Sequence, residues 1–182
     1  MKKVNLRLYK KTYKPGRNFL VRILWYYTNI LFFKSSLLPF FWLKRFLLRL
    51  FGAKLGQGVV IKPSVNIKYP WKLKIGENSW IGENVWIDNL ADVEIGKNVV
   101  ISQGAMLLTG SHDYTKITFD VVVKKIILED GVWIGAKSIV MPGVRCKSHS
   151  ILSVNSVANK DLEPYFIYFG NPATKVKKRI IS

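Results

Sequence analysis

Two histidines and one cysteine are the side chains of this sequence best suited to acid–base or nucleophilic chemistry near neutral pH. His112 lies in the polar stretch T-G-S-H-D-Y-T, and His149 lies in K-S-H-S. A neutral imidazole can take a proton from a hydroxyl group, so either histidine could serve as a general base. A lone histidine in a polar loop is more often a solvated surface residue, so the surrounding elements must decide between these readings.

Metal and redox chemistry find little support in these residues. The two histidines stand 37 positions apart and no Cys/His cluster has metal-ligand spacing. A zinc site of the γ-carbonic-anhydrase kind needs about three histidine ligands, so we expect no metal. One cysteine cannot form an internal disulfide, which fits a reducing compartment.

From Leu55 onward, aliphatic residues recur at every sixth position, a period that belongs to neither an α-helix nor an alternating strand. Each hexad would supply one short strand and one corner, with the aliphatic side chain pointing into a narrow interior. Stacked coils would bury a continuous apolar column, so stability would come from neighbouring repeats. The pattern predicts a parallel β-helix built on four series: Leu55, Ile61, Ile67, Leu73; Ile75, Ile81, Ile87, Val93; Ile95, Ile101, Leu107; and Leu128, Ile134, Val140, Cys146, Leu152, Ala158.

The repeat stops at Leu107 and resumes near residues 126–128, which predicts a loop at 109–126 thrown out from the coils. Long loops in otherwise regular folds tend to carry function, and His112 lies in this one. His149 falls within the regular hexads, where we expect a coil-surface residue. Cys146 occupies an inward position, where we expect a small buried apolar side chain rather than a nucleophile.

Polar residues about one coil before His112 could complete a site around it. Asn84, Asp88 and Asn89 occupy these positions, and stacking could bring them near the loop. An Asn amide could donate to a developing oxyanion, and a carboxylate could fix the histidine tautomer. Asparagine is also favoured at tight corners for conformational reasons, so both readings stay open. Asp113 could contact an acceptor or cap its own loop.

The N-terminal segment differs sharply in charge from the repeats. Residues 1–54 hold thirteen Lys or Arg and no Asp or Glu, within a chain of net charge +18. The bases alternate with Leu, Phe, Trp and Tyr, which favours contact with an anionic membrane surface over nucleic acid. The longest charge-free run, residues 23–33, is too short to span a bilayer. We expect two short helices, one amphipathic, whose bases face lipid, or whose apolar faces pack on the protein or a neighbouring subunit.

These changes of pattern divide the chain into three parts. Residues 1–51 form a basic, hydrophobic helical segment, residues 52–162 form the β-helix, and residues 163–182 form a C-terminal tail with a basic end. The fold class is therefore all-β with an N-terminal helical extension.

Several phrases of the sequence resemble the hexapeptide-repeat acyltransferases, and among them the colanic-acid-biosynthesis type of acetyltransferase. The phrases are LFGAKLGQGVVI (50–61), ENVWIDNLADVEIGKNVVISQGAMLLTGSHDYT (83–115), GVWIGAKSIVMPGV (131–144) and YFGNPATKVKKR (168–179). The resemblance implies a left-handed parallel β-helix, acetyl-CoA as cosubstrate, and a homotrimer with active sites between subunits. It also implies that His112 acts as general base in direct acetyl transfer, without an acyl-enzyme.

The same resemblance implies where acetyl-CoA would bind. Backbone groups around Gly135, Ala136 and Val154 would meet the pantetheine arm. Asn159 and Lys160 match positions near the CoA end, and Lys178, with Lys175, Lys177 and Arg179, could neutralise its phosphates. The chain departs from the family at R-C-K-S-H-S (145–150), which makes the local coil shape there less predictable.

Together these observations predict an O-acetyltransferase that modifies a sugar hydroxyl in exopolysaccharide biosynthesis. The membrane-like N-terminal segment favours a lipid-linked glycan acceptor and a cytoplasmic protein held peripherally at the inner face of the plasma membrane. Two alternatives stay open: an N-acetyltransferase of a nucleotide-linked amino sugar, and a non-catalytic membrane scaffold.

Overall fold

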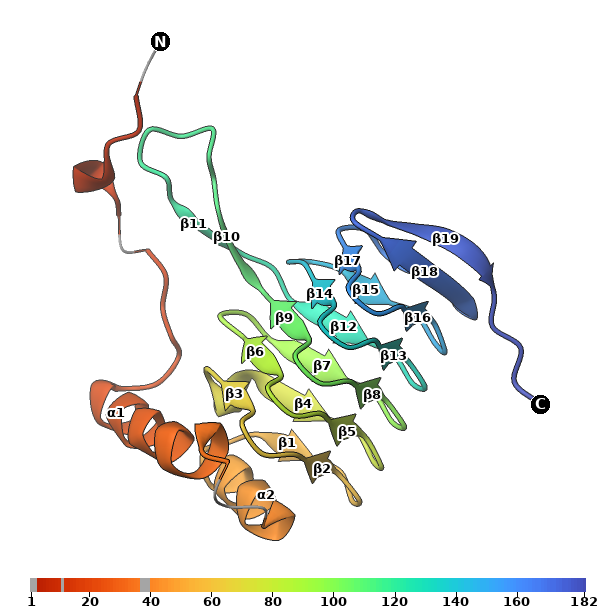
Figure 1. Cartoon of the computed structure of the whole chain (residues 1–182). Helices are drawn as coiled ribbons and strands as arrows, with labels where there is room; N and C mark the ends of the chain where they lie inside the picture. The colour runs from red at the N-terminus through yellow and green to blue at the C-terminus, as the bar shows by residue number, and fades with distance from the viewer. Residues whose placement is uncertain (1–2, 11, 37–39) are drawn as a thin grey trace.

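Hexads from residue 54 onward wind into a parallel β-helix with three flat sides (Figure 1). The computed structural model describes residues 3–10, 12–36 and 40–182. Parallel sheets form the three sides, which we name sheets A, B and C. Sheet A holds β1 (Lys54–Leu55), β4 (Leu73–Ile75), β7 (Val93–Ile95), β12 (Ile126–Leu128) and β15 (Arg145–Cys146). Sheet C holds β3 (Asn66–Ile67), β6 (Trp86–Asp88), β9 (Met106–Leu108), β14 (Ile139–Val140) and β17 (Val157–Ala158).

Sheet B is the longest side because a C-terminal hairpin extends it. It holds β2 (Val60–Ile61), β5 (Trp80–Ile81), β8 (Val100–Ile101), β13 (Trp133–Ile134), β16 (Ile151–Leu152), β18 (Phe166–Gly170) and β19 (Ala173–Lys178). Strand β18 pairs in parallel with β16, and β19 then runs antiparallel to β18. The segment expected as a C-terminal tail is therefore a hairpin that covers the last coil (Figure 1), and the lysines of its expected basic end, Lys175, Lys177 and Lys178, lie within β19.

The predicted aliphatic series form the interior of the β-helix. In sheet B the register stacks Ile61, Ile81, Ile101, Ile134 and Leu152 directly on one another. All five are buried, and of the predicted inward positions only Leu55, in the first coil, is partly exposed. Burial of each such aliphatic side chain stabilises the fold by about 1.5–3 kcal/mol, because its apolar surface is removed from water. The prediction of a hexapeptide β-helix is confirmed.

Cys146 occupies its predicted inward position on sheet A, in register with Leu128. Its side chain is fully buried. Burial raises the pKa of its thiol well above the ordinary value, since the charged thiolate loses its hydration. The expectation of a small buried apolar residue is confirmed.

The outer faces of the three sheets differ in chemistry. Sheet A presents charges, and Lys74 and Lys125 both pair with Glu94. Sheet B instead presents a row of apolar side chains in register, in which Trp80 and Trp133 are about half exposed. Solvent-exposed apolar rows of this kind mark surfaces that meet another molecule.

Helices close the N-terminal end of the β-helix (Figure 1). Helix α1 (Phe19–Thr28) continues into the π-helical turn η2 (Asn29–Lys34), and α2 (Phe41–Leu50) leads into the first coil. Short 3₁₀ turns η1 (Leu6–Leu8) and η3 (Pro70–Lys72) complete the helical elements. Trp25, Phe33 and Leu48 are buried against the coils, while much of the outer surface of α1 and α2 is apolar and exposed. The two expected helices are confirmed, and no helix in the described residues is long and apolar enough to cross a bilayer.

The basic residues of α2 form hydrogen bonds to the first coil. Lys44 Nζ donates to Lys62 O over 2.9 Å, Arg45 Nη1 to Val59 O over 3.0 Å, and Arg49 Nη2 to Leu55 O over 3.2 Å. These carbonyls belong to the first coil, which has no preceding coil to pair with. The expectation that the bases of this helix face lipid is wrong for Lys44, which is buried, whereas Arg45 is partly exposed and Arg49 is exposed while both donate to the open end of the β-helix.

Candidate active site

His112 ends the first strand of a hairpin that projects from the corner between sheets C and A (Figure 1). Strands β10 (Gly110–His112) and β11 (Val121–Val123) pair antiparallel, with His112 opposite Val121. Thr109 anchors the base of this hairpin: it is fully buried, and its hydroxyl donates to Asp88 O over 2.9 Å. The loop expected at 109–126 is therefore an ordered hairpin standing on the stacked coils.

The hairpin holds the imidazole of His112 in one orientation. Its ring stacks on Phe119 with the ring centroids 4.4 Å apart and the planes 9° from parallel. Its Nδ1 lies 2.9 Å from the carbonyl oxygen of Phe119. A carbonyl oxygen can only accept, so this bond requires the hydrogen on Nδ1 and leaves Nε2 with a free lone pair in the neutral ring. The side chain itself is exposed, so Nε2 is open to a reactant.

Asp113 shapes the tip of the hairpin. Its carboxylate accepts from the Thr115 hydroxyl over 2.6 Å and from the Thr115 backbone N–H over 3.1 Å. These two hydrogen bonds, together with nearby Lys116, lower the pKa of the Asp113 carboxyl. Of the two roles expected for Asp113, this geometry supports the loop cap.

The three polar residues from the preceding coil lie in different settings. Asp88 pairs in register with Leu108, at the base of the hairpin, and its carboxylate lies 2.9 Å from Lys68 Nζ. Asn89 is fully buried, with its amide bonded at both ends to the Tyr69 backbone of the coil before. Asn84 is exposed in the left-handed conformation, φ 58°, at the corner between sheets B and C. Within one chain, stacking thus brings Asp88 to the hairpin, whereas the Asn89 side chain is directed to the preceding coil and Asn84 occupies another corner.

A groove along sheet B brings together three of the residues expected at the cofactor. It encloses about 470 Å³ and contains Gly135, Ala136 and Val154. Trp133 forms one wall, held by a 2.9 Å hydrogen bond from its indole N–H to Ser102 Oγ. A Cβ added at Gly135 would lie 2.5 Å from Val154 N, so only glycine lets the two coils stack here. A narrow groove with an aromatic wall suits an extended apolar chain carrying amides.

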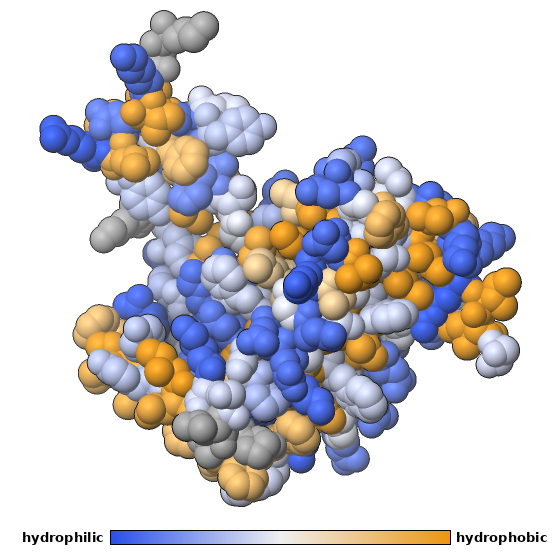
Figure 2. All heavy atoms as spheres, in the orientation of Figure 1, coloured by the Kyte–Doolittle hydropathy of each residue, from blue (hydrophilic) through white to orange (hydrophobic). Residues whose placement is uncertain are grey.

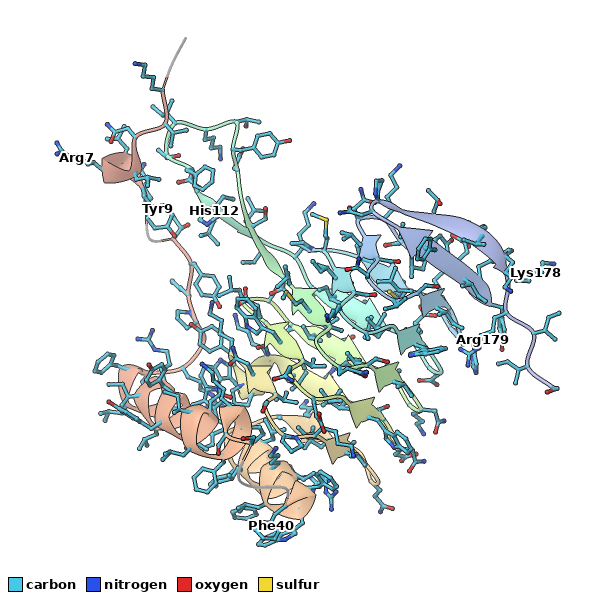
Figure 3. All side chains as sticks on the ribbon, viewed as in Figure 1. Arg7, Tyr9, Phe40, His112, Lys178 and Arg179 are labelled. Atoms are coloured by element: carbon cyan, nitrogen blue, oxygen red, sulfur yellow. The ribbon has the colours of Figure 1, made fainter. Side chains whose placement is uncertain are left out.

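The remaining residues expected at the cofactor lie elsewhere. Asn159 and Lys160 are exposed beyond the end of β17, and Lys178 is exposed at the end of β19. His112 and Lys178 project from opposite sides of the molecule (Figure 3). Arg179 turns inward and donates to Gly131 O over 2.8 Å, which is a structural contact. One chain therefore does not gather the histidine, the groove and these cations into a single site.

Two residues of the site went unnoticed in the sequence. Phe119 fixes the orientation of His112, and Trp133 forms the wall of the groove. For Trp133 a signal was available, since a large aromatic directly before the inward Ile134 must point outward. Nothing local marks Phe119, because its role depends on how the hairpin folds back. Among the described residues, His, Cys, Asp and Glu do not gather in groups that could hold a metal ion.

Known proteins share this sequence and this architecture. No family model matches the chain. An Escherichia coli protein assigned to colanic acid biosynthesis as the acetyltransferase WcaF is 36% identical over 170 residues, which cover 93% of each chain. A hexapeptide-repeat acetyltransferase from Vibrio cholerae, solved in complex with acetyl-CoA, superposes with a TM-score of 0.78 at 25% identity, over 89% of this chain and 88% of that one. A galactoside acetyltransferase bound to coenzyme A shares the fold, with a TM-score of 0.76 at 22% identity over 87% and 80% of the two chains.

Proposed function

The chain belongs to the hexapeptide-repeat acetyltransferases of the colanic-acid-biosynthesis type and is an acetyl-CoA-dependent acetyltransferase; from this premise we propose that it acetylates a sugar hydroxyl in exopolysaccharide assembly, with His112 as general base. The observation that carries the proposal is the bond between His112 Nδ1 and Phe119 O. This bond directs the basic Nε2 outward from an ordered hairpin, as proton removal from an incoming hydroxyl requires.

The proposed reaction uses this geometry in two steps. Nε2 of His112 removes the hydroxyl proton as the sugar oxygen attacks the thioester carbonyl, and the Phe119 carbonyl stabilises the resulting imidazolium through Nδ1. When the carbon–sulfur bond breaks, His112 returns the proton to the thiolate of coenzyme A. The groove at Gly135, Ala136 and Val154 would hold the pantetheine arm, and Lys160 and Lys178 would approach its phosphates.

We place the complete site between neighbouring subunits of a homotrimer. His112 and the groove belong to different corners of one chain, so a second copy would have to bring its own groove to the hairpin. The exposed apolar row of sheet B, which includes Trp80 and Trp133, supplies a surface for such packing. The corner residue Asn84 could reach an acceptor or oxyanion only in such an assembly.

The acceptor and the location are proposed from the N-terminal helices. Large side chains such as Leu24, Leu31, Trp42 and Phe46 are more than half exposed on α1, η2 and α2. Figure 2 shows apolar atoms gathered over this end of the molecule. Residues 1–54 also carry no acid, so this surface suits the interface of an anionic bilayer. We infer a cytoplasmic protein held peripherally at the inner face of the plasma membrane, acting on a lipid-linked glycan.

The membrane contact is tested by co-sedimentation with lipid vesicles. The chain should bind phosphatidylglycerol-containing vesicles more strongly than phosphatidylcholine vesicles, and the double variant Leu24→Ser/Phe46→Ser should lose most of this binding. Val176→Ser, which removes an exposed apolar side chain of β19, is the matched control. Equal binding by both variants would contradict this location.

The reaction is tested by measuring release of coenzyme A from acetyl-CoA with a panel of lipid-linked and nucleotide-linked sugars. His112→Asn should lower turnover by about two orders of magnitude or more. His149→Asn is the matched control, because His149 lies at a corner with φ 58°, a conformation that asparagine accepts. Equal turnover by the two variants would overturn the role of His112. Turnover only with amino sugars would establish N-acetylation in place of O-acetylation.

A further inference from the structure

A second hollow, which we call the helix cleft, separates the N-terminal helices from sheet C. It encloses about 360 Å³ between α1 and η2 on one side and β3 and β6 on the other. Its lining includes Arg22, Tyr26, Lys34, Asn66, Trp86 and Asp88. The catalytic proposal above uses neither its aromatic nor its basic side chains.

The cleft combines aromatic walls with polar groups in the manner of a saccharide site. Tyr26 and Trp86 are substantially exposed on its two sides, and Tyr69 also belongs to the lining. Aromatic faces can cover the apolar face of a sugar ring, while their polar edges and the Asn66 amide reach its hydroxyls. Such side chains bind without losing much conformational freedom.

The positive charge of the cleft exceeds what the chain itself neutralises. Asp88 pairs with Lys68 at 2.9 Å, which accounts for one of the three cations. Arg22 and Lys34 form no ion pair with any carboxylate in the described part of the chain. Arg22 Nε is buried and has no hydrogen-bond partner among these residues. A buried donor without a partner is costly, so an anionic ligand would relieve it.

The walls of the cleft are fixed before any ligand arrives. Asn29 is buried, and its Nδ2 donates to Asn66 Oδ1 over 2.8 Å. The indole N–H of Trp25 donates to Ile67 O over 2.9 Å, which ties α1 to β3. These bonds hold Arg22 and Lys34, on α1 and η2, at a set position above sheet C. A preorganised site loses little free energy in ordering itself on binding.

The cleft lies between the base of the catalytic hairpin and the exposed apolar surface of the helices. Asp88, in its lining, is in register with Leu108, four residues before His112. Leu24 and Leu31 on α1 and η2 are exposed. We propose that the helix cleft binds the phosphate-linked sugar of the acceptor, with Arg22 and Lys34 on the phosphate, so that the substrate class is a glycosyl phosphate or diphosphate rather than a neutral saccharide. This deepens the proposed function and rests on it for the identity of the acceptor.

Phosphate recognition is tested by calorimetric titration of the full chain, without acetyl-CoA. The probes are the 1-phosphates of glucose, galactose and fucose, and the methyl glycosides of the same sugars. At least one phosphate should bind about tenfold more tightly than its glycoside, since only the phosphate can form charge-assisted hydrogen bonds with Arg22 and Lys34. Arg22→Gln and Lys34→Gln should each abolish most of that preference, and Trp86→Ala should weaken both probes. Lys74→Gln, on the outer face of sheet A, should change nothing.

Two outcomes would overturn the proposal. One is equal affinity for phosphates and glycosides, and the other is a phosphate preference that survives in both Arg22→Gln and Lys34→Gln. This titration measures binding and not turnover. If the His112→Asn assay contradicted the role of His112, a measured phosphate preference would still stand. If no phosphate preference were found, the role of His112 would be unaffected. Acetylation assays with a nucleoside diphosphate hexose and a short polyprenyl diphosphate hexose then distinguish the sources. In either assay, Arg22→Gln should raise the KM for the acceptor and leave the KM for acetyl-CoA unchanged.

Discussion

The stacked coils and the His112 hairpin are held in place by different kinds of contact, although they are consecutive in the chain. In the coils each position is fixed twice, by a buried aliphatic column and by backbone hydrogen bonds to the coil on either side, as around Ile101 and Ile134. In the hairpin the described contacts are mostly internal: β10 pairs with β11, and His112 rests on Phe119. The coils thus supply rigidity, while the hairpin supplies a side chain open to reactants. Changes in the coils should act on stability, and changes in the hairpin should act on chemistry.

Gly135→Val, in the coils, should have the largest effect on stability. A Cβ at residue 135 would meet Val154 N at 2.5 Å and Leu152 O at 2.8 Å, so two coils would have to separate. We expect the free energy of unfolding to fall by about 4 kcal/mol. Denaturant unfolding followed by circular dichroism measures it.

Val122→Ala is the companion change on the hairpin, at an exposed position of β11. It should lower the free energy of unfolding by less than about 1 kcal/mol. Similar losses in both variants would mean that the hairpin is as much a part of the stable core as the coils.

Phe119→Ala tests whether the hairpin works by orienting the histidine. The variant removes the ring stacked on His112 at 4.4 Å but keeps the backbone carbonyl that accepts from Nδ1. We expect kcat to fall about tenfold, since misplacing a catalytic group costs rate rather than stability. The KM for acetyl-CoA and the melting temperature should stay near wild type.

The conservative change Phe119→Tyr keeps an aromatic ring in place and should restore kcat. A general drop in stability for Phe119→Ala, without recovery in the tyrosine variant, would assign Phe119 to folding instead of positioning.

Thr115→Val should have the smallest effect, confined to the tip of the hairpin. It removes the hydroxyl that contributes most to lowering the pKa of Asp113, so that pKa should rise toward its ordinary value of 3.8. Because the folded-state pKa is lowered, the contribution of Asp113 to hairpin order is present above its ordinary pKa and is lost as the pH falls through the lowered pKa. In the variant the folded-state pKa lies closer to the ordinary value, so the contribution should be smaller and its loss should be complete at a higher pH. Carboxyl NMR titration measures the shift, and Thr174→Val, in β19, should leave the titration of Asp113 unchanged.

Much of this molecule could be foreseen from its sequence. The hexad series placed the inward residues, the end of the first run at Leu107 placed the hairpin, and the motif resemblance pointed to a left-handed β-helical acetyltransferase, as the relatives confirm. These features are readable because each coil depends only on its neighbours, so a local pattern repeated along the chain already specifies the fold. His112 was singled out for the same reason, as the histidine where the pattern breaks.

Only the tertiary structure decided where the polar side chains point. The sequence could not show that Lys44, Arg45 and Arg49 turn toward first-coil carbonyls, nor that Asn89 bonds to the Tyr69 backbone. It also gave no sign that Phe119 would fix the tautomer of His112, or that Arg22 and Lys34 would face Trp86 across a cleft. A flexible polar side chain takes the partner that the folded backbone brings within reach, and such partners lie tens of residues away. The hydrophobic periodicity of the sequence cannot predict these partners, because it indicates which side chains are buried and not which groups they contact.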